Sequence, residues 1–148
     1  MTKLISQTQK SYLAGFLDGD GSVYTQLKPN KTYRYGFQVV NYIVLFQSQK
    51  DQNNFAKVCA LINLGYLRVR KDGILEYIIG TQEGVKKFIE IVEPYVLMKK
   101  AQINLLKKII VQKSKIKCRK DFNDLAGLID TFRDLNYSKK RKVRTLTP

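Results

Sequence analysis

The stretch YLAGFLDGDGS, residues 12–22, decides how this chain of 148 residues is expected to fold. Its apolar residues recur at helical spacing, at Leu13, Phe16 and Leu17. This spacing predicts a helix over residues 6–19 that ends at Gly21. Directly afterwards, residues 22–28 alternate between two sets of side chains, which predicts a strand. The stretch therefore marks the passage from a helix into a sheet.

Two glycines and two aspartates share the C-terminal half of this helix. Gly15 and Gly19 are four residues apart, so they lie on one face, where a second helix can approach closely because neither residue has a Cβ. Asp18 and Asp20 lie where the helix dipole disfavours negative charge by about 0.3–1 kcal/mol. When two such helices pack about a two-fold axis, each Asp20 meets its symmetry mate, and the carboxylates repel unless a cation lies between them. The arrangement predicts a site for Mg²⁺, a hard ion that prefers oxygen ligands.

The rest of the chain reads as two β-hairpins, each followed by a helix. The stretch PNKTY supplies the first turn and Asp72-Gly73 the second, and further helices follow. This order predicts an α+β fold, an αββαββα core plus C-terminal helices, with one four-stranded antiparallel sheet and the helices on one face. Gln38 and Gln47 have opposite parity along the second strand, which predicts a β-bulge between them. The expected elements are strands 22–28 and 35–48, helix 51–63, a hairpin within 65–80, and helices 81–92, 97–113 and 121–135.

The face of the sheet away from the helices carries polar and basic side chains. A ribbon of this kind fits the major groove of DNA, where Arg and Gln make bidentate contacts to guanine and adenine. The alternative is an ordinary solvated sheet face, and the net charge favours the binding interpretation. The contact residues expected on this face and at the first hairpin turn are Tyr24, Gln26, Lys28, Asn30, Tyr33, Gln38, Arg68, Arg70 and Glu76.

The composition is strongly basic. The chain has 27 Lys and Arg against 12 Asp and Glu, a net charge of +15. Such an excess repels itself within a compact domain and favours a polyanionic partner, with nucleic acid as the first candidate. A membrane surface is the rival, but no run approaches the ~18 apolar residues of a spanning helix. The absence of histidine excludes Ser-His-Asp hydrolases, His-dependent nucleases and zinc sites that need His.

The chain gives weaker signals about its compartment and boundaries. Cys59 and Cys118 are too few for a zinc cage and are expected to be reduced thiols of an intracellular protein, with a single disulfide as the alternative. The N-terminus has no long apolar stretch and predicts no secretory signal. The abundance of Lys, Ile and Asn is typical of an AT-rich genome, so an organelle, a mitochondrion or chloroplast, is expected. We expect one domain over residues 1–137 and a flexible basic tail over 138–148.

The string LAGFLDGDG, residues 13–21, resembles the signature of the LAGLIDADG homing endonucleases. The order of the expected elements over residues 10–135 is similar to the core order of that family. The single motif resembles the small, intron-encoded members that act as homodimers. The resemblance implies a metal-dependent, site-specific endonuclease that hydrolyses phosphodiester bonds of double-stranded DNA at a long pseudo-palindromic target. It also implies a dimer interface on the motif helix, built from Tyr12, Gly15, Phe16 and Gly19.

The resemblance further implies roles in an active site. Asp20 matches the metal-binding acid that ends the motif, and the Gly19 carbonyl is implied as a further ligand of Mg²⁺. Gln49 matches a position whose side chain helps to order the active-site water, and Gln47, two residues earlier, is its competitor. Lys99 matches a lysine that stabilises charge near the cleaved phosphate.

Two other interpretations compete with the endonuclease. One is a non-catalytic nucleic-acid binder, such as an intron RNA splicing cofactor (a maturase) that kept the fold, in which Asp20 and Lys99 would be dispensable. The other is a structural RNA-binding protein, which explains the charge but not the arrangement of Gly15, Gly19 and Asp20.

A second string, DLAGLIDTF at residues 124–132, matches the name of the family more literally than the first. Phe132 occupies the position equivalent to Asp20 and cannot bind a metal, and too few residues follow it for another pair of hairpins. The apolar residues of the string repeat at 3–4 spacing, which predicts the core stripe of an amphipathic helix. One chain therefore offers one motif, and cleavage of both DNA strands requires a C2 homodimer.

Overall fold

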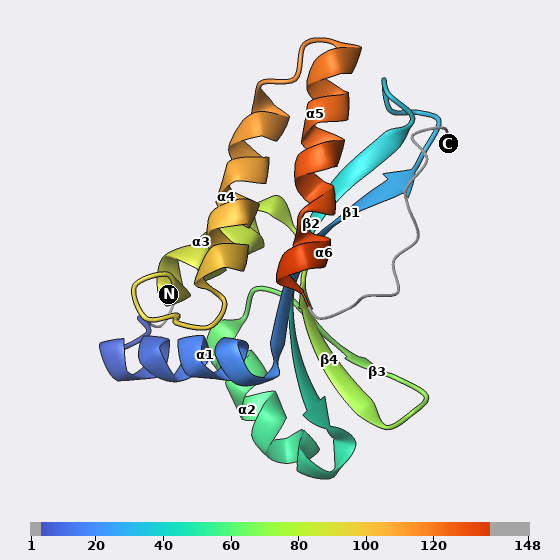
Figure 1. Cartoon of the computed structure of the whole chain (residues 1–148). Helices are drawn as coiled ribbons and strands as arrows, with labels where there is room; N and C mark the ends of the chain where they lie inside the picture. Colours follow the sequence, from blue (N-terminus) through green and yellow to red (C-terminus); the bar gives the residue numbers. More distant parts are fainter. Residues whose placement is uncertain (1–3, 137–148) are drawn as a thin grey trace.

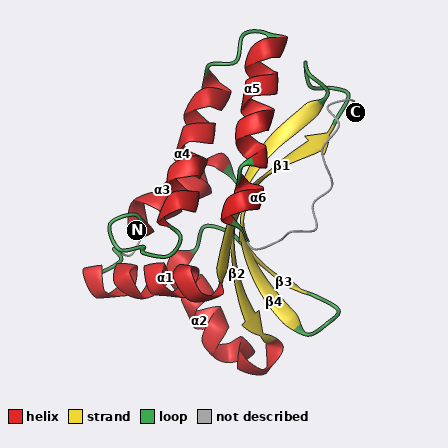
Figure 2. Ribbon diagram, in the orientation of Figure 1, coloured by secondary structure: helices red, strands yellow, loops and turns green. Residues whose placement is uncertain are grey.

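The computed structural model describes residues 4–136 as one antiparallel sheet with helices gathered on one side of it (Figure 1). Figure 2 shows the same arrangement, with the strands curving away from the helical layer. The elements are α1 (Gln7–Asp20), β1 (Gly21–Pro29), β2 (Phe37–Ser48), the 3₁₀ turn η1 (Gln49–Asp51), α2 (Gln52–Ile62), β3 (Tyr66–Val69), β4 (Ile74–Ile79), α3 (Gln82–Val92), α4 (Lys100–Ser114), α5 (Arg119–Asp130) and α6 (Phe132–Leu135).

The strands follow the order β1-β2-β4-β3, and all neighbours are antiparallel. The β1–β2 register runs without interruption from Gly21 opposite Leu45 to Pro29 opposite Phe37. The predicted bulge between Gln38 and Gln47 is therefore wrong. The parity of the two glutamines differs because they lie on opposite faces of one regular strand, not because a residue is inserted.

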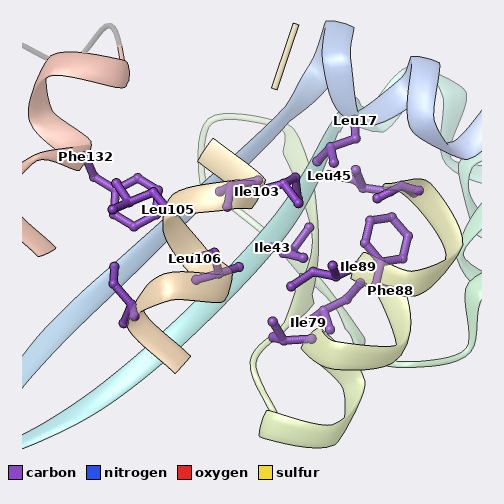
Figure 3. Close-up of a cluster of buried hydrophobic side chains, with 14 of the residues drawn as sticks. Leu17, Ile43, Leu45, Ile79, Phe88, Ile89, Ile103, Leu105, Leu106 and Phe132 are labelled. Carbon is purple, nitrogen blue, oxygen red and sulfur yellow. The ribbon is translucent and has the colours of Figure 1, made fainter. Parts of the chain in front are cut away.

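Odd-numbered residues of β1, β2 and β4 face the helices and form the core. Figure 3 shows Ile43, Leu45 and Ile79 from the sheet packed against Leu17 of α1 and Phe88 of α3. All of these side chains are fully buried. From Phe37 to Ile43 the odd residues of β2 are buried and the even ones half-buried, which gives the sheet one covered and one open face.

The first helix begins where the sequence predicts. Ser6 caps α1, since its hydroxyl accepts a hydrogen bond from the N–H of Gln9 while the Gln9 side chain accepts one from the N–H of Ser6. This reciprocal pair is a capping box and satisfies two of the N–H groups at the helix start. The helix then continues to Asp20, one residue beyond the predicted end.

The last predicted helix, 121–135, is wrong as a single element. The structure has α5 and α6, separated at Thr131. The N–H and the hydroxyl of Thr131 both donate to the carbonyl of Leu128, at 3.1 and 2.6 Å, so the last turn tightens and the α-helix ends. The predicted core stripe of this segment is confirmed, because its apolar residues are buried: Phe122, Leu125, Ala126, Ile129 and Phe132.

The two cysteines are not bonded to each other. Cys59 is buried in α2, and burial raises the pKa of its thiol to about 11, so the group stays neutral near pH 7. Cys118 is exposed before α5. None of the helices within residues 4–136 combines the length and apolarity needed to cross a bilayer. The predicted domain boundary at 137 and the predicted tail 138–148 lie outside the described residues.

Candidate active site and nucleic-acid interface

The C-terminal end of α1 is held against the segment that precedes α4. The carboxylate of Asp18 accepts hydrogen bonds from the N–H groups of Leu97 and Lys99, at 2.9 and 3.0 Å. The Nζ atom of Lys99 lies 3.5 Å from the backbone carbonyl of Asp18. Hydrogen bonds to an ionised carboxylate are about twice as strong as neutral ones, so Asp18 fixes Lys99 beside the end of α1. The same contacts explain why α4 starts at Lys100 and not at the predicted residue 97.

The carboxylate of Asp20 is exposed at the last position of α1. It makes no hydrogen bond or ion pair with any other residue between 4 and 136. The carbonyl of Gly19 is one of the last four of the helix, which have no intrahelical partner. In the same range, no three acidic, cysteine or histidine side chains gather into a metal-binding cluster. Asp20 and Gly19 thus offer oxygen ligands that fit Mg²⁺, as one part of a coordination shell.

Gly21 is required where α1 turns into β1. A Cβ at this residue would lie 2.7 Å from the carbonyl oxygen of Leu17, and the Gly21 N–H donates to that same carbonyl. The φ angle of −117° is ordinary for a strand, so it is the close approach that demands glycine. Because Gly21 pairs directly with Leu45, this tight junction fixes the position of Asp20 relative to the sheet.

The two candidate glutamines lie in different surroundings. The chain passes from Asp20 straight into β1, whose first residue pairs with Leu45. Gln47 lies two residues further along β2, on the face that carries the helices. Gln49 lies beyond the end of β2, where its N–H donates to the carbonyl of Gly73 in the β3–β4 turn. The register therefore places Gln47 nearer to Asp20 than Gln49.

The face of α1 that carries the glycines is open. A Cβ added at Gly15 or at Gly19 would meet no atom within 4 Å. Tyr12 is 56% exposed on the same helix. Phe16 is half-buried and stacks on Phe55 of α2, with ring centroids 5.8 Å apart. Three of the four predicted interface residues, Tyr12, Gly15 and Gly19, are thus exposed on the surface, and Phe16 packs partly within its own chain against Phe55 and Tyr12.

The open face of the sheet brings together the predicted contact residues of β1 and β2. The rings of Tyr24 and Tyr42 pair across the strands with centroids 5.2 Å apart, and Nζ of Lys28 lies 5.3 Å from the centroid of Tyr42. Gln26 is exposed, and Gln38 is half-buried on the same face. The aromatic pair thereby orients the lysine outward along the face.

The arginines of the second hairpin are tied together by carboxylates. The Glu76 carboxylate lies 4.0 Å from Arg68 and 3.5 Å from Arg70, and Arg70 also pairs with Asp72 at 2.6 Å. Each of these pairs is partly exposed and contributes little stability by itself. Their effect is geometric, because Glu76 holds both guanidinium groups on the open face of the sheet.

The tip of the β1–β2 hairpin is built by local hydrogen bonds. Oδ1 of Asn30 accepts from both the N–H and the hydroxyl of Thr32, at 3.0 and 2.7 Å, which is an Asx-type turn. Tyr33 at the tip is 45% exposed. Arg119 from the start of α5 donates to the carbonyl of Tyr35 and anchors the tip to the helices. Asn30 therefore has a structural role beside its predicted contact to DNA.

Sequence reasoning missed two features of this region. One is the role of Asp18, whose hydrogen-bond donors, the N–H groups of Leu97 and Lys99, lie far away in the sequence and leave no local signal. The other is the apolar part of the open sheet face, which includes Val40, Tyr42 and Phe46. The strict alternation of β2 could have identified these residues, but the assumed bulge obscured it.

Comparison with known proteins places this geometry in a family. The sequence profile described as "LAGLIDADG endonuclease" matches residues 13–112, from α1 into α4. DNA endonuclease I-CreI of Chlamydomonas reinhardtii is 36% identical over 140 residues, which cover 92% of this chain and 83% of I-CreI. DNA endonuclease I-CvuI of Chlorella vulgaris is 28% identical over 142 residues, which cover 96% of this chain and 88% of I-CvuI.

Solved structures agree with the sequence matches. I-CvuI in complex with DNA targets, in the presence of Mg or Ca, superimposes with a TM-score of 0.84 at 28% identity, over 93% of this chain and 87% of I-CvuI. The archaeal intron-encoded endonuclease I-Vdi141I superimposes with a TM-score of 0.79 at 15% identity, over 94% of this chain and 90% of that one, which shows the fold.

This chain combines an antiparallel sheet that has one open face with an exposed carboxylate at the end of the adjoining helix, and the proteins that match it in sequence are DNA endonucleases. This chain belongs to the LAGLIDADG endonuclease family. The predicted family and the predicted α+β fold are confirmed. The string at 124–132, the more literal match to the family name, lies outside the matched residues.

Proposed function

We propose that this protein is a site-specific, double-stranded DNA endonuclease that uses Mg²⁺ and acts as a homodimer on a long pseudo-palindromic target. The observation that carries the proposal is the exposed carboxylate of Asp20, directly before the first strand of the sheet and at the helix end that Lys99 contacts through the carbonyl of Asp18. I-CreI and I-CvuI are DNA endonucleases, and I-CvuI is seen with target DNA and with Mg or Ca. These relatives support both the substrate and a divalent cation.

The residues at the end of α1 have separate tasks in this proposal. Asp20 and the Gly19 carbonyl hold the cation through oxygen atoms. When bound, a divalent cation supplies Lewis acidity and an activated water for hydrolysis of a phosphodiester. The ammonium of Lys99, fixed by the contacts of Asp18, stabilises negative charge on the phosphate. The open face of the sheet positions the duplex in its major groove.

The homodimer is supported by the surface around α1. One chain supplies one Asp20, so cleavage of both strands at one site needs a second copy. The open glycines of α1 allow the close approach of a symmetry-related helix. Large apolar side chains are exposed on α1 and beside its end, with Tyr12 at 56%, Leu97 at 82% and Met98 at 70%. A second copy that covers these residues removes apolar surface from water.

The proposal is tested by selection of cleaved sites from a library of randomised duplexes. We expect both strands to be cut at sites with two-fold sequence symmetry, with Mg²⁺ present and not with EDTA. Cutting that is independent of sequence, or that persists in EDTA, contradicts the proposal. If the protein instead cuts no member of the library but binds a structured intron RNA, the maturase interpretation is the correct one. The predicted organellar location stays a prediction.

The active-site glutamine is expected to be Gln47 rather than Gln49, because the register places Gln47 nearer to Asp20. Replacing Gln47 by alanine is expected to lower the single-turnover rate of cleavage by about a hundredfold, the lower range for a residue that handles the reacting water. Gln49→Ala is the matched control and is expected to retain the rate of the unmodified protein. A larger loss in Gln49→Ala than in Gln47→Ala reverses the assignment.

A further inference from the structure

The open face of the sheet contains an apolar side chain in the middle of its polar contact residues. Val40 lies on β2 at an even position, so it points away from the helices and is half-buried. Gln26 of β1 is directly opposite, and Gln38 and Tyr42 lie two residues away on the same strand and face. Directly opposite Cβ atoms in such a pair are about 4.5–5.5 Å apart. Val40 is therefore surrounded by groups suited to contact base edges.

Val40 is not part of the core. The buried core residues of β2 lie at odd positions on the helix side, such as Val39 and Ile43. The two apolar residues that are buried on the open face, Val44 and Ile78, pack side by side across β2 and β4, nearer to the catalytic end. Val40 lies further out, on the part of β2 that pairs only with β1 among the described strands. Its side chain is left available for a ligand on the open face.

The two glutamines beside Val40 suit one kind of base pair. Neither Gln26 nor Gln38 makes a side-chain hydrogen bond within residues 4–136, so both amides are available. A glutamine amide reads adenine through N6 and N7 in the major groove, and the thymine of the same pair presents its C5-methyl group in that groove. An apolar side chain contacts this methyl group, whereas guanine and cytosine offer only polar edges there.

We propose that Val40, together with Gln26 and Gln38, selects A·T base pairs in the outer part of each half-site, with Val40 in contact with the thymine methyl group. This inference rests on the proposed function and specifies its substrate. On the same face, the second hairpin carries Arg68 and Arg70, which pair with Glu76, and we call these residues the arginine arm. Arginine contacts guanine in the major groove. The half-site is therefore bipartite, with G·C pairs facing the arginine arm and A·T pairs facing Val40.

The strand also sets a distance between the two parts. Val40 and Phe46, which lies opposite Glu76 in the arginine arm, are six residues apart on one face of a regular strand. At about 3.3 Å per residue this separation is about 20 Å, which corresponds to about six base pairs of DNA at 3.4 Å each. We therefore expect the A·T preference about six base pairs away from the base pair that faces Phe46, in the direction of the outer end of the half-site.

The test uses duplexes selected for binding in Ca²⁺ and for cleavage in Mg²⁺, followed by replacement of single thymines with deoxyuridine. Deoxyuridine lacks only the methyl group and keeps every hydrogen bond. At the position that faces Val40, we expect a loss of about fourfold in affinity, the worth of one buried methyl group. Other thymines outside the contact face are expected to show no effect.

The matched variants are Val40→Ser and Val69→Ser. Serine replaces both methyl groups of valine with a single hydroxyl, so Val40→Ser is expected to bind thymine and deoxyuridine targets equally. Val69 is also a strand valine and is 52% exposed, but it lies at an odd position on the opposite face from Arg68, so Val69→Ser is expected to keep the discrimination. Thermal melting of both variants checks that each is folded.

The outcomes separate this inference from the proposed function. The role of Val40 is overturned if the unmodified protein binds thymine and deoxyuridine targets with equal affinity at every position. It is also overturned if the selected sites show no A·T preference in the outer part of the half-site, beyond the base pairs that face the arginine arm. Methyl-dependent binding without any cleavage in Mg²⁺ supports the role of Val40 and overturns the nuclease. A protein that selects no duplex at all overturns both.

Discussion

Replacing Asp20 by asparagine is expected to abolish DNA cleavage while DNA binding is retained. Asparagine keeps the shape of the side chain but removes the negative charge that holds a divalent cation. Loss of the group that carries the cation is expected to lower the cleavage rate by at least about a thousandfold. Binding is expected to be unchanged or tighter, because one negative charge near the phosphates is removed. Single-turnover cleavage and a binding isotherm on one target duplex measure the two effects separately.

The control for this substitution is Asp124→Asn. Asp124 is also an exposed aspartate on a helix, and it lies in the second, literal motif on α5. We expect its replacement to leave cleavage unchanged. Normal cleavage by Asp20→Asn would show that the helix end is not the metal-binding site, and loss of both binding and cleavage would show a structural role instead.

Replacing Gly15 by leucine is expected to convert a dimer into a folded monomer that no longer cuts both strands. Nothing lies within 4 Å of a Cβ at this position, so the monomer has room for the side chain. Leucine also favours a helix over glycine by about 0.8 kcal/mol, so the melting temperature of the monomer is expected to hold or rise. In a dimer built on α1, the new side chains force the two helices apart. The loss of paired half-sites is expected to weaken target binding by about 10²- to 10⁴-fold.

The chain supplies a close control for this experiment. Gly127 occupies the same place in LAGLID at residues 125–130 as Gly15 does in LAGFLD at residues 13–18, and a Cβ there also meets nothing within 4 Å. Gly127→Leu is expected to leave both the oligomeric state and cleavage unchanged. Sedimentation and a plasmid cleavage assay compare the two variants. A Gly15→Leu protein that remains dimeric and active would place the interface elsewhere than on α1.

The fold could be predicted from the sequence because its signals are local. Apolar residues repeat every three to four positions in the helices and every second position in the strands, and Ser6, Asp72 and Gly73 mark element boundaries. One of the errors arises where distant contacts decide. The start of α4 is set by hydrogen bonds from Leu97 and Lys99 to a carboxylate 79 to 81 residues away, which no local pattern reveals.

The candidate site could be predicted only in part. Alternation along β1 correctly assigns Tyr24, Gln26 and Lys28 to one face, because odd and even residues of a regular strand lie on opposite faces. Odd or even position in a strand does not determine how far a residue lies from Asp20, so the sequence could not choose between Gln47 and Gln49. The choice required the register of β1 and β2 in the structure. The pairing of Glu76 with two arginines depends on side-chain directions that the sequence does not specify.

The link between Asp18 and the segment before α4 has a consequence for the order of folding. Its hydrogen bonds join residues 79 and 81 positions apart, and both hairpins, α2 and α3 lie between them. Contacts of such separation form late, because the loop they close must first lose its chain entropy. A chain still emerging from the ribosome therefore presents Asp20 without Lys99. Nuclease activity is expected to arise as one cooperative event at the completion of the domain, so that no partly synthesised form can nick DNA.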